Sequence, residues 1–276
     1  MEIRYQNSPK ETEQMTTGEL RRNFLIENLM QNDLVNLVYS HYERVIVGGA
    51  KPVGKSLKLL TQPELKAEFF LERRELGIIN VGGSGTVVAD KKEYDLDKLD
   101  CLYLSKGVRE VKFNSANRQD PSIYYFLSCP AHHAYPNKLM KKDKATPVQL
   151  GDAYTSNRRT IYKYIHEDGI RSCQLVMGLT ILENGSVWNS IPPHTHTRRM
   201  EAYFYFDMPD QHRVFHFMGE PQQTRHLVMG NHQAVISAPW SVHYGCGTSN
   251  YGFIWGMTGE NKAFTDMDVV PVSELR

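Results

Sequence analysis

Most of the chain after residue 44 consists of short apolar runs separated by glycine, proline and charged residues. The clearest runs cover residues 45–49, 76–81, 123–127, 161–165 and 173–182. They are rich in Val, Ile, Leu and Tyr, and runs of this length and composition are typical of β-strands. Short strands at close spacing, joined by turns that contain glycine, indicate a β-sandwich or barrel. We therefore expect an all-β fold.

The N-terminal part of the chain does not follow this pattern. Residues 1–15 are polar and predict an arm or a loose lead-in. Thr16 and Glu19 then have the spacing of a capping box, in which two side chains bond to the free backbone N–H groups at the start of a helix. A second short helix is expected at residues 33–39. The predicted fold is thus all-β with short N-terminal helices.

The charged run at residues 138–144 separates two halves of similar texture. It has the character of a linker or exposed loop, and we place a domain boundary near residue 150. The sequence therefore predicts two domains, residues 1–150 and residues 151–276. The glycine-rich stretch at residues 82–85 is predicted to be a hairpin turn, because a phosphate-binding loop would end in Gly-Lys-Ser/Thr.

Composition restricts the class of protein. The chain has 276 residues, and 32 Lys and Arg against 31 Asp and Glu give a formal net charge of +1, so no attraction to nucleic acid or acidic membranes is expected. No apolar stretch is long enough for a membrane span, and the N-terminus lacks the apolar run of a secretory signal, so we expect a soluble cytoplasmic protein. The four cysteines form no Cys-x-x-Cys pair, which argues against a zinc ribbon or redox motif.

The candidate chemistry is concentrated at His194 and His196, with Glu201 shortly after them and His243 further downstream. Residues two apart on a strand point to the same face, so the two histidines present their imidazoles to one side of a sheet. Glu201 would lie on the opposite face unless a bulge or turn at residues 197–199 interrupts the strand. With His243 on a second strand, the four would form a shell of three imidazoles and one carboxylate. Polar residues on unrelated strands are the alternative.

The His-x-His-x4-Glu spacing at residues 194–201, followed by Pro-x3-His at residues 239–243, resembles the two motifs of the cupin superfamily of small β-barrels. The first half resembles a second cupin without ligands, with residues 77–83 in the place of the first motif and residues 104–107 in that of the second. The whole chain further resembles the 4-deoxy-L-threo-5-hexosulose-uronate ketol-isomerases. That resemblance is carried by residues 70–80, 172–175, 178–180, 194–201, 251–255 and 259–261.

The resemblance implies a bicupin with one zinc ion per subunit, held by His194, His196, Glu201 and His243. It also implies a homohexamer that acts on a small uronate in bacterial pectin breakdown. The implied reaction converts 5-dehydro-4-deoxy-D-glucuronate to 3-deoxy-D-glycero-2,5-hexodiulosonate, an aldose-ketose interconversion. Zinc follows from the resemblance alone, since three imidazoles and a carboxylate also suit manganese, iron or nickel.

Such a reaction needs a Lewis acid for the charge on the substrate oxygens and a base that moves a proton. Glu201 is a weak candidate for this base because it is committed to the metal, and the sequence does not single out another residue. Arg159 and Arg199 are candidates for binding the substrate carboxylate, with surface solvation as the alternative. Tyr203 continues the face of Glu201 and is a candidate hydroxyl donor, with barrel packing as the alternative. Rival functions are a 5-deoxy-glucuronate isomerase, a cupin dioxygenase and a non-catalytic sugar-binding cupin.

Overall fold

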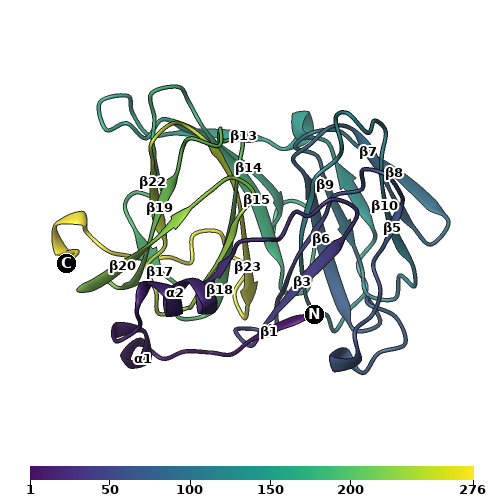
Figure 1. Cartoon of the computed structure of the whole chain (residues 1–276), viewed down its shortest axis with the longest axis horizontal. Helices are drawn as coiled ribbons and strands as arrows, with labels where there is room; N and C mark the ends of the chain where they lie inside the picture. The colour runs from purple at the N-terminus through teal and green to yellow at the C-terminus, as the bar shows by residue number, and fades with distance from the viewer.

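The chain folds into two barrels, each made of two sheets that enclose an apolar core, as the short apolar runs predict. The computed structural model describes residues 1–276 and places the two barrels side by side (Figure 1). This arrangement confirms the predicted all-β fold with short N-terminal helices. No helix in it has the length and apolar character needed to cross a membrane.

The first barrel combines a seven-stranded and a four-stranded sheet. The strands of the larger sheet lie in the order β1 (Glu2–Arg4), β3 (Val35–Ser40), β4 (Ile46–Ala50), β11 (Tyr124–Pro130), β6 (Arg74–Asn80), β9 (Cys101–Leu104) and β12 (Lys138–Met140). Those of the smaller sheet lie in the order β5 (Leu57–Lys58), β10 (Val111–Ser115), β7 (Gly85–Ala89) and β8 (Lys92–Leu96).

The second barrel repeats this plan. Its larger sheet has the order β13 (Pro147–Leu150), β14 (Arg159–Ile165), β15 (Val176–Leu182), β23 (Gly252–Gly259), β18 (Arg199–Phe206), β21 (Ala234–Ser237) and β2 (Leu25–Ile26). Its smaller sheet has the order β16 (Trp188–Asn189), β22 (Tyr244–Gly247), β19 (Val214–Glu220) and β20 (Gln223–Met229). A separate two-stranded ladder joins β17 (His194–Thr195) to β24 (Asp268–Val269).

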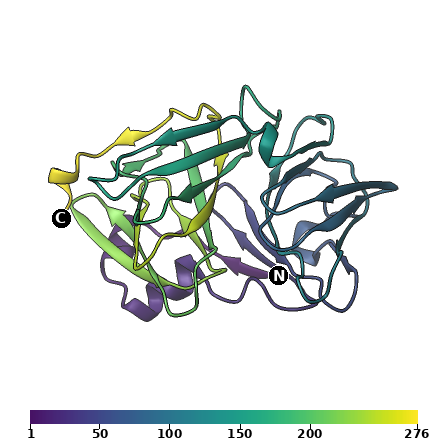
Figure 2. The ribbon, with the colours of Figure 1, turned by 90° about the horizontal axis from the view of Figure 1, so that it is seen from above.

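The N-terminal segment crosses from one barrel to the other. β1 pairs with β3 of the first barrel, whereas β2 pairs with β21 at the edge of the larger sheet of the second barrel. Between them, α1 (Pro9–Glu13) and α2 (Thr17–Phe24) lie against the second barrel, as the purple helices in Figure 2 show. The division into residues 1–150 and residues 151–276 stays a prediction, and the first of these ranges contributes strands to both barrels.

The helical N-terminus is more ordered than its sequence suggests. The predicted capping box of Thr16 and Glu19 starts α2, and a second box of Ser8 and Glu11 starts α1. The guanidinium group of Arg225 donates hydrogen bonds to the backbone carbonyls of Thr12 and Glu13 at the end of α1 and of Met15 just after it. The prediction of a loose lead-in was therefore wrong, because polar side chains here cap helices rather than meet only solvent.

The structure corrects three further local predictions. Most of residues 33–39, predicted to be helical, lies in β3, because this stretch pairs with both β1 and β4. The turn at residues 82–85 connects β6 to β7, which belong to different sheets, so it is not a hairpin. Residues 138–144, expected to be a linker or loop, include β12, which pairs with β9.

The interface between the barrels is itself part of the core. Along β6, Leu76 and Ile78 belong to the core of the first barrel, whereas Ile79 belongs to the larger core that spans both barrels. Gly77 lies between Leu76 and Ile78, and a Cβ atom added there would stand 2.7 Å from a methyl carbon of Leu175 in the second barrel. The close approach of the two sheets therefore requires a residue without a side chain at this position.

A buried carboxylate also joins the barrels. Glu75 in β6 is fully buried and accepts hydrogen bonds from the backbone N–H groups of Cys173, Gln174 and Leu175, at 2.7, 2.8 and 2.9 Å. The Tyr103 hydroxyl donates to the same carboxylate at 2.8 Å. A carboxylate that accepts several N–H groups in this way fixes the turn before β15 to the first barrel.

Candidate metal centre

A turn between two strands brings Glu201 to the side of the two histidines. β17 ends at Thr195, residues 196–198 leave the strand, and β18 begins at Arg199. The Arg199 N–H donates to the carbonyl of His196 at 3.5 Å across this turn. The interruption predicted from the sequence is therefore present, and without it the alternation of the strand would place Glu201 on the other face.

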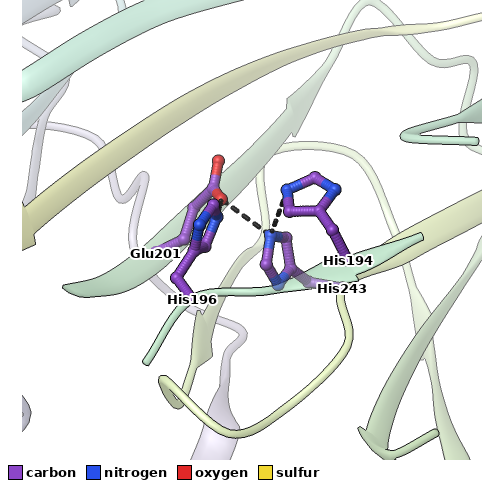
Figure 3. A group of neighbouring side chains, drawn as sticks. All are labelled: His194, His196, Glu201 and His243. Carbon is purple, nitrogen blue, oxygen red and sulfur yellow. Dashed lines mark hydrogen bonds and ion pairs between the residues drawn. The ribbon is translucent and has the colours of Figure 1, made fainter. Parts of the chain in front are cut away.

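His243 reaches the same place from the segment between β21 and β22. The backbone N–H of His196 donates to the carbonyl of Pro239 at 3.0 Å, which ties this segment to the one that carries the first two histidines. Figure 3 shows the side chains of His194, His196, Glu201 and His243 converging on one point. The structure thus brings together all four residues that the sequence predicted as metal ligands.

The four possible ligand atoms, one from each residue, all lie within 4.8 Å of one another. Glu201 Oε2 is 2.7 Å from His243 Nε2 and 2.9 Å from His196 Nε2, and His243 Nε2 is 3.1 Å from His194 Nε2. All four side chains are buried. A cluster of three imidazoles and one carboxylate at these separations can hold a metal ion.

Two backbone carbonyls orient the imidazoles. His196 Nδ1 lies 2.6 Å from the carbonyl oxygen of Asp266, and His243 Nδ1 lies 3.1 Å from that of Ser241. A carbonyl only accepts, so each Nδ1 carries the proton and a neutral ring turns a bare Nε2 toward the centre. Those lone pairs and the Glu201 carboxylate would then face one another with no hydrogen between them. A cation resolves this conflict, so the donor set fits a metal ion.

Burial controls the charges in this cluster. It lowers the pKa of His194 to about 2, with His243 adding to the shift, and it also lowers the pKa of His196. Burial would raise the pKa of the Glu201 carboxyl, but positive charge and hydrogen-bond donors at His243 and His196 hold that pKa well below the ordinary value. A bound cation would supply that positive charge between neutral rings, and metal binding requires an ionised carboxylate and unprotonated Nε2 atoms.

Three of the four residues, His194, His196 and Glu201, line a cavity of about 180 Å³. Most of its other lining is apolar and comes from residues such as Ile161, Phe253, Trp255, Met257, Phe264 and Met267. The remaining polar side chains in the wall are Arg159, Thr180, Ser190, Arg199 and Tyr203. An apolar cavity with a few convergent polar groups is the usual form of a small-molecule site.

Arg199, predicted to bind a substrate carboxylate, lies at the cavity but is largely occupied by the protein. Its guanidinium group donates to the backbone carbonyls of Asn261, Ala263 and Asp266, at 3.2, 2.7 and 3.0 Å, and its side chain is almost fully buried. Its main observed contacts are therefore to the segment that follows β23.

Arg159 and Tyr203, the other two predicted substrate contacts, also line the cavity. Arg159 donates to the carbonyl of Asn157 at 2.9 Å and, at 3.5 Å, to that of Ile191, which leaves N–H groups of its fork available. The Tyr203 hydroxyl is 2.7 Å from Ser190 Oγ. Tyr203 is fully buried, and burial raises the pKa of its phenol well above the ordinary value, so the hydroxyl stays protonated.

Two contributors to the site were missed by the sequence analysis. Ser190 has a left-handed backbone conformation with φ 53°, uncommon for a serine, and nothing in the sequence marks it beyond the prolines that follow. Asp266 contributes through its backbone carbonyl, which no residue type reveals. His216, which is not a member of the four-residue cluster, is fully buried and bonds through Nδ1 to the Tyr205 hydroxyl at 2.9 Å.

The whole chain is similar in sequence to known proteins of one family. The sequence model described as the KduI/IolB family matches residues 24–272. The chain is 54% identical over 276 residues to a 4-deoxy-L-threo-5-hexosulose-uronate ketol-isomerase of Shouchella clausii, with 100% of both chains covered. It is 52% identical over 276 residues, again with 100% of both covered, to the protein of that name from Halalkalibacterium halodurans.

Solved structures show the same fold at low sequence identity. An IolB-like protein from Salmonella typhimurium aligns with a TM-score of 0.72 and 14% identity, covering 90% of this chain and 97% of that one. A variant of the Bacillus subtilis oxalate decarboxylase aligns with a TM-score of 0.61 and 10% identity, covering 87% of this chain and 78% of that one. These likenesses support the two-barrel cupin architecture.

Proposed function

The chain belongs to the KduI/IolB family, and from this premise we propose that it is a ketol-isomerase converting 5-dehydro-4-deoxy-D-glucuronate to 3-deoxy-D-glycero-2,5-hexodiulosonate. The observation that carries the proposal is identity near one half, over the full length, to curated ketol-isomerases of this substrate. A role in pectin and uronate breakdown in the cytoplasm, and assembly as a homohexamer, belong to the same proposal.

We propose that the resident metal is one zinc ion per subunit, held by His194, His196, Glu201 and His243. The convergent, buried donor set supports a divalent cation, and zinc is chosen from the family resemblance. When bound, such an ion supplies Lewis-acid stabilisation of negative charge on substrate oxygens. Four protein ligands leave room for substrate oxygens only if the coordination number can increase.

Among the two arginines at the cavity, Arg159 is the better candidate for the substrate carboxylate. Its fork retains unused donors, whereas Arg199 is occupied by three backbone carbonyls. The hydroxyls of Tyr203 and Ser190 offer hydrogen bonds to substrate hydroxyl or carbonyl oxygens from the same wall. The apolar remainder of the wall excludes water from the reacting carbons.

A second candidate is a 5-deoxy-glucuronate isomerase, favoured by the fold likeness to an IolB-like protein. That likeness comes with only 14% identity, so the full-length relatives weigh more. A non-catalytic sugar-binding cupin is a third possibility, and the convergent buried donor set at the wall of a largely apolar cavity argues against it.

The test is turnover of freshly prepared 5-dehydro-4-deoxy-D-glucuronate by the purified protein, with 5-deoxy-glucuronate assayed in parallel. We expect formation of the 2,5-diketo acid, loss of activity after chelation, and recovery on addition of zinc. Zinc-loaded protein that leaves this substrate unchanged but isomerises 5-deoxy-glucuronate would transfer the proposal to the second candidate. Zinc binding without turnover of either would support a sugar-binding role.

A further inference from the structure

We propose that residues 260–269, named here the C-terminal strap, position the histidines of the metal centre, and that the ion pair of Arg198 with Asp266 holds the strap in place. This inference rests on the proposed metal binding and adds a positioning role for a segment outside the four ligands. The strap follows β23, crosses the site and ends in β24.

The strap contacts His196 directly. The carbonyl oxygen of Asp266 accepts the Nδ1 proton of His196 at 2.6 Å, which leaves the Nε2 lone pair directed at the centre. The ring can rotate about its side-chain bonds only by giving up this hydrogen bond. The position of the Asp266 carbonyl therefore determines both the tautomer of His196 and the direction of its ligand atom.

The strap is also bonded to the strand of His194. In the β17–β24 ladder His194 pairs with Val269, and Val270, the residue directly after the strap, donates its N–H to the carbonyl of Pro193 at 2.8 Å. Phe264, Met267 and Val269 of the strap form part of the cavity wall. One segment thus holds both members of the His-x-His pair and covers the space beside them.

Two consecutive arginines hold the strap against the turn that precedes β18. Arg198 Nε donates to Asp266 Oδ1 at 2.7 Å, and Arg198 also bonds to Asp268 Oδ2 at 3.0 Å. Arg199 donates to three strap carbonyls, including that of Asp266 at 3.0 Å. The Asp266 side chain and backbone are therefore both engaged, and the carbonyl that orients His196 cannot move without breaking charge-assisted bonds.

The strap connects the metal centre to the first barrel as well. Lys262 Nζ donates to the carbonyl of Ser172 at 2.7 Å, and the three residues after Ser172 give their N–H groups to Glu75. The first barrel, which has no metal ligands, is therefore connected to the metal centre through the turn at residues 172–175 and then the strap. Through these bonds the first barrel helps to hold the ligands of the second in position.

The alternative is that the strap only covers apolar surface, in which case its loosening would lower stability but leave metal affinity unchanged. Arg198→Gln and Asp266→Asn separate these roles, because both remove the ion pair while the Asp266 carbonyl and all four ligands remain. Arg158→Gln is the matched control. Arg158 is a half-exposed arginine of the same barrel whose ion pair, with Glu183 at 3.7 Å, lies outside the strap.

The experiment measures the zinc affinity of each metal-free protein by competition with a chromogenic chelator, at a temperature where circular dichroism shows it folded. We expect both variants to bind zinc about tenfold more weakly than the unaltered protein, the range found for groups that orient metal ligands, with the control unchanged. Arg198→Lys, which keeps the charge, should lie between, and it replaces Arg198→Gln if that variant does not fold.

Unaltered zinc affinity in folded Arg198→Gln and Asp266→Asn overturns the positioning role and leaves the proposed function intact. Failure of the unaltered protein to bind zinc overturns the metal centre itself, and with it both proposals. A loss of affinity as large in Arg158→Gln as in the strap variants also overturns the inference, because the effect would then not come from the strap.

Discussion

The two barrels share one strand plan but differ in what their sheets enclose. β6 and β18 hold the same place in the strand order of their sheets, and both begin with a buried arginine, Arg74 and Arg199. Both arginines donate to backbone carbonyls. Two residues further on, the first barrel has Leu76 in its apolar core, whereas the second has Glu201 in the metal centre.

The interior of the first barrel is filled by large apolar side chains. Phe113 and Phe126 stack with ring centroids 5.6 Å apart, and Tyr124 lies against Phe113. In the second barrel part of the interior is occupied by three imidazoles, a carboxylate and a cavity instead. The alternation of apolar residues therefore determines the barrel, while a few inward-facing positions determine whether the barrel can hold a metal and catalyse a reaction.

The largest effect is expected from making the second barrel like the first at one position. Glu201→Leu introduces the residue found at Leu76, removes the only carboxylate from the cluster and puts an apolar side chain of similar size in its place. We expect loss of bound zinc and at least about a thousandfold lower kcat/KM, because a metal's charge stabilisation is worth several kcal/mol. Metal analysis and steady-state kinetics on the purified variant measure both.

Glu183→Gln, at an exposed carboxylate of the same barrel, is the control and should retain full activity. Activity within tenfold of the unaltered enzyme in Glu201→Leu would show that this carboxylate does not distinguish the two barrels.

The next effect tests how far the barrels depend on each other. Glu75→Ala leaves three buried backbone N–H groups and the Tyr103 hydroxyl without their acceptor. We expect the free energy of unfolding to fall by about 3 kcal/mol, since each unsatisfied buried group costs roughly 1 to 3 kcal/mol and partial relaxation recovers some of it. Urea denaturation followed by fluorescence and circular dichroism measures the change.

Glu93→Gln, an exposed carboxylate on β8, is the matched control and should change stability little. A stability loss no larger in Glu75→Ala than in this control would mean that the carboxylate does not hold the barrels together.

A smaller effect is expected at the polar wall that only the second barrel has. Arg159→Gln removes the proposed partner of the substrate carboxylate, and a charge-assisted hydrogen bond is worth about 1.5 to 3 kcal/mol. We therefore expect KM to rise about tenfold with little change in kcat, measured by initial rates over a range of substrate concentrations. Arg158→Gln, one residue away but half exposed, should keep the normal KM. Equal KM values in the two variants would remove Arg159 from the site.

The smallest effect is expected from Tyr203→Phe, which deletes one hydroxyl and keeps the ring. The hydroxyl contacts Ser190 Oγ at 2.7 Å in the cavity wall. Loss of a neutral hydrogen bond, about 0.5 to 1.5 kcal/mol, predicts a several-fold fall in kcat/KM with normal zinc content. The same fall in Tyr162→Phe, at a tyrosine outside the cavity wall, would assign the change to packing rather than to substrate contact.

Much of the metal centre was predictable because its residues lie close together in sequence. The two-residue spacing of His194 and His196, and the odd offset of Glu201, required a break in the strand, and the structure has a turn there. The all-β fold likewise follows from local apolar runs. Only the position of His243 beside the other three residues depends on contacts between distant segments, and the Pro-x3-His motif at residues 239–243 predicted it.

What escaped prediction depends on contacts between distant segments. Residues 33–39 were predicted to be helical because the parallel pairing of β3 with β1, across the two intervening helices, cannot be inferred from a local pattern. The role of Arg199 was missed because its partners are backbone carbonyls more than sixty residues away, and a carbonyl has no signature in the sequence. The same reason hid Asp266.

The position of β2 has a consequence for how the protein folds. The chain starts in the first barrel, places β2 at the edge of the second, returns to build β3 to β12, and only then forms β13. Most of the first barrel, β3 to β12, is therefore inserted between β2 and β13 of the second barrel, and residues 27–233 form the loop that must close before β2 can meet β21. Folding of the inserted strands shortens the effective length of that loop. A fragment that begins at residue 151 would lack this edge strand and the capped helices before it, so the metal-binding half is not a separable module.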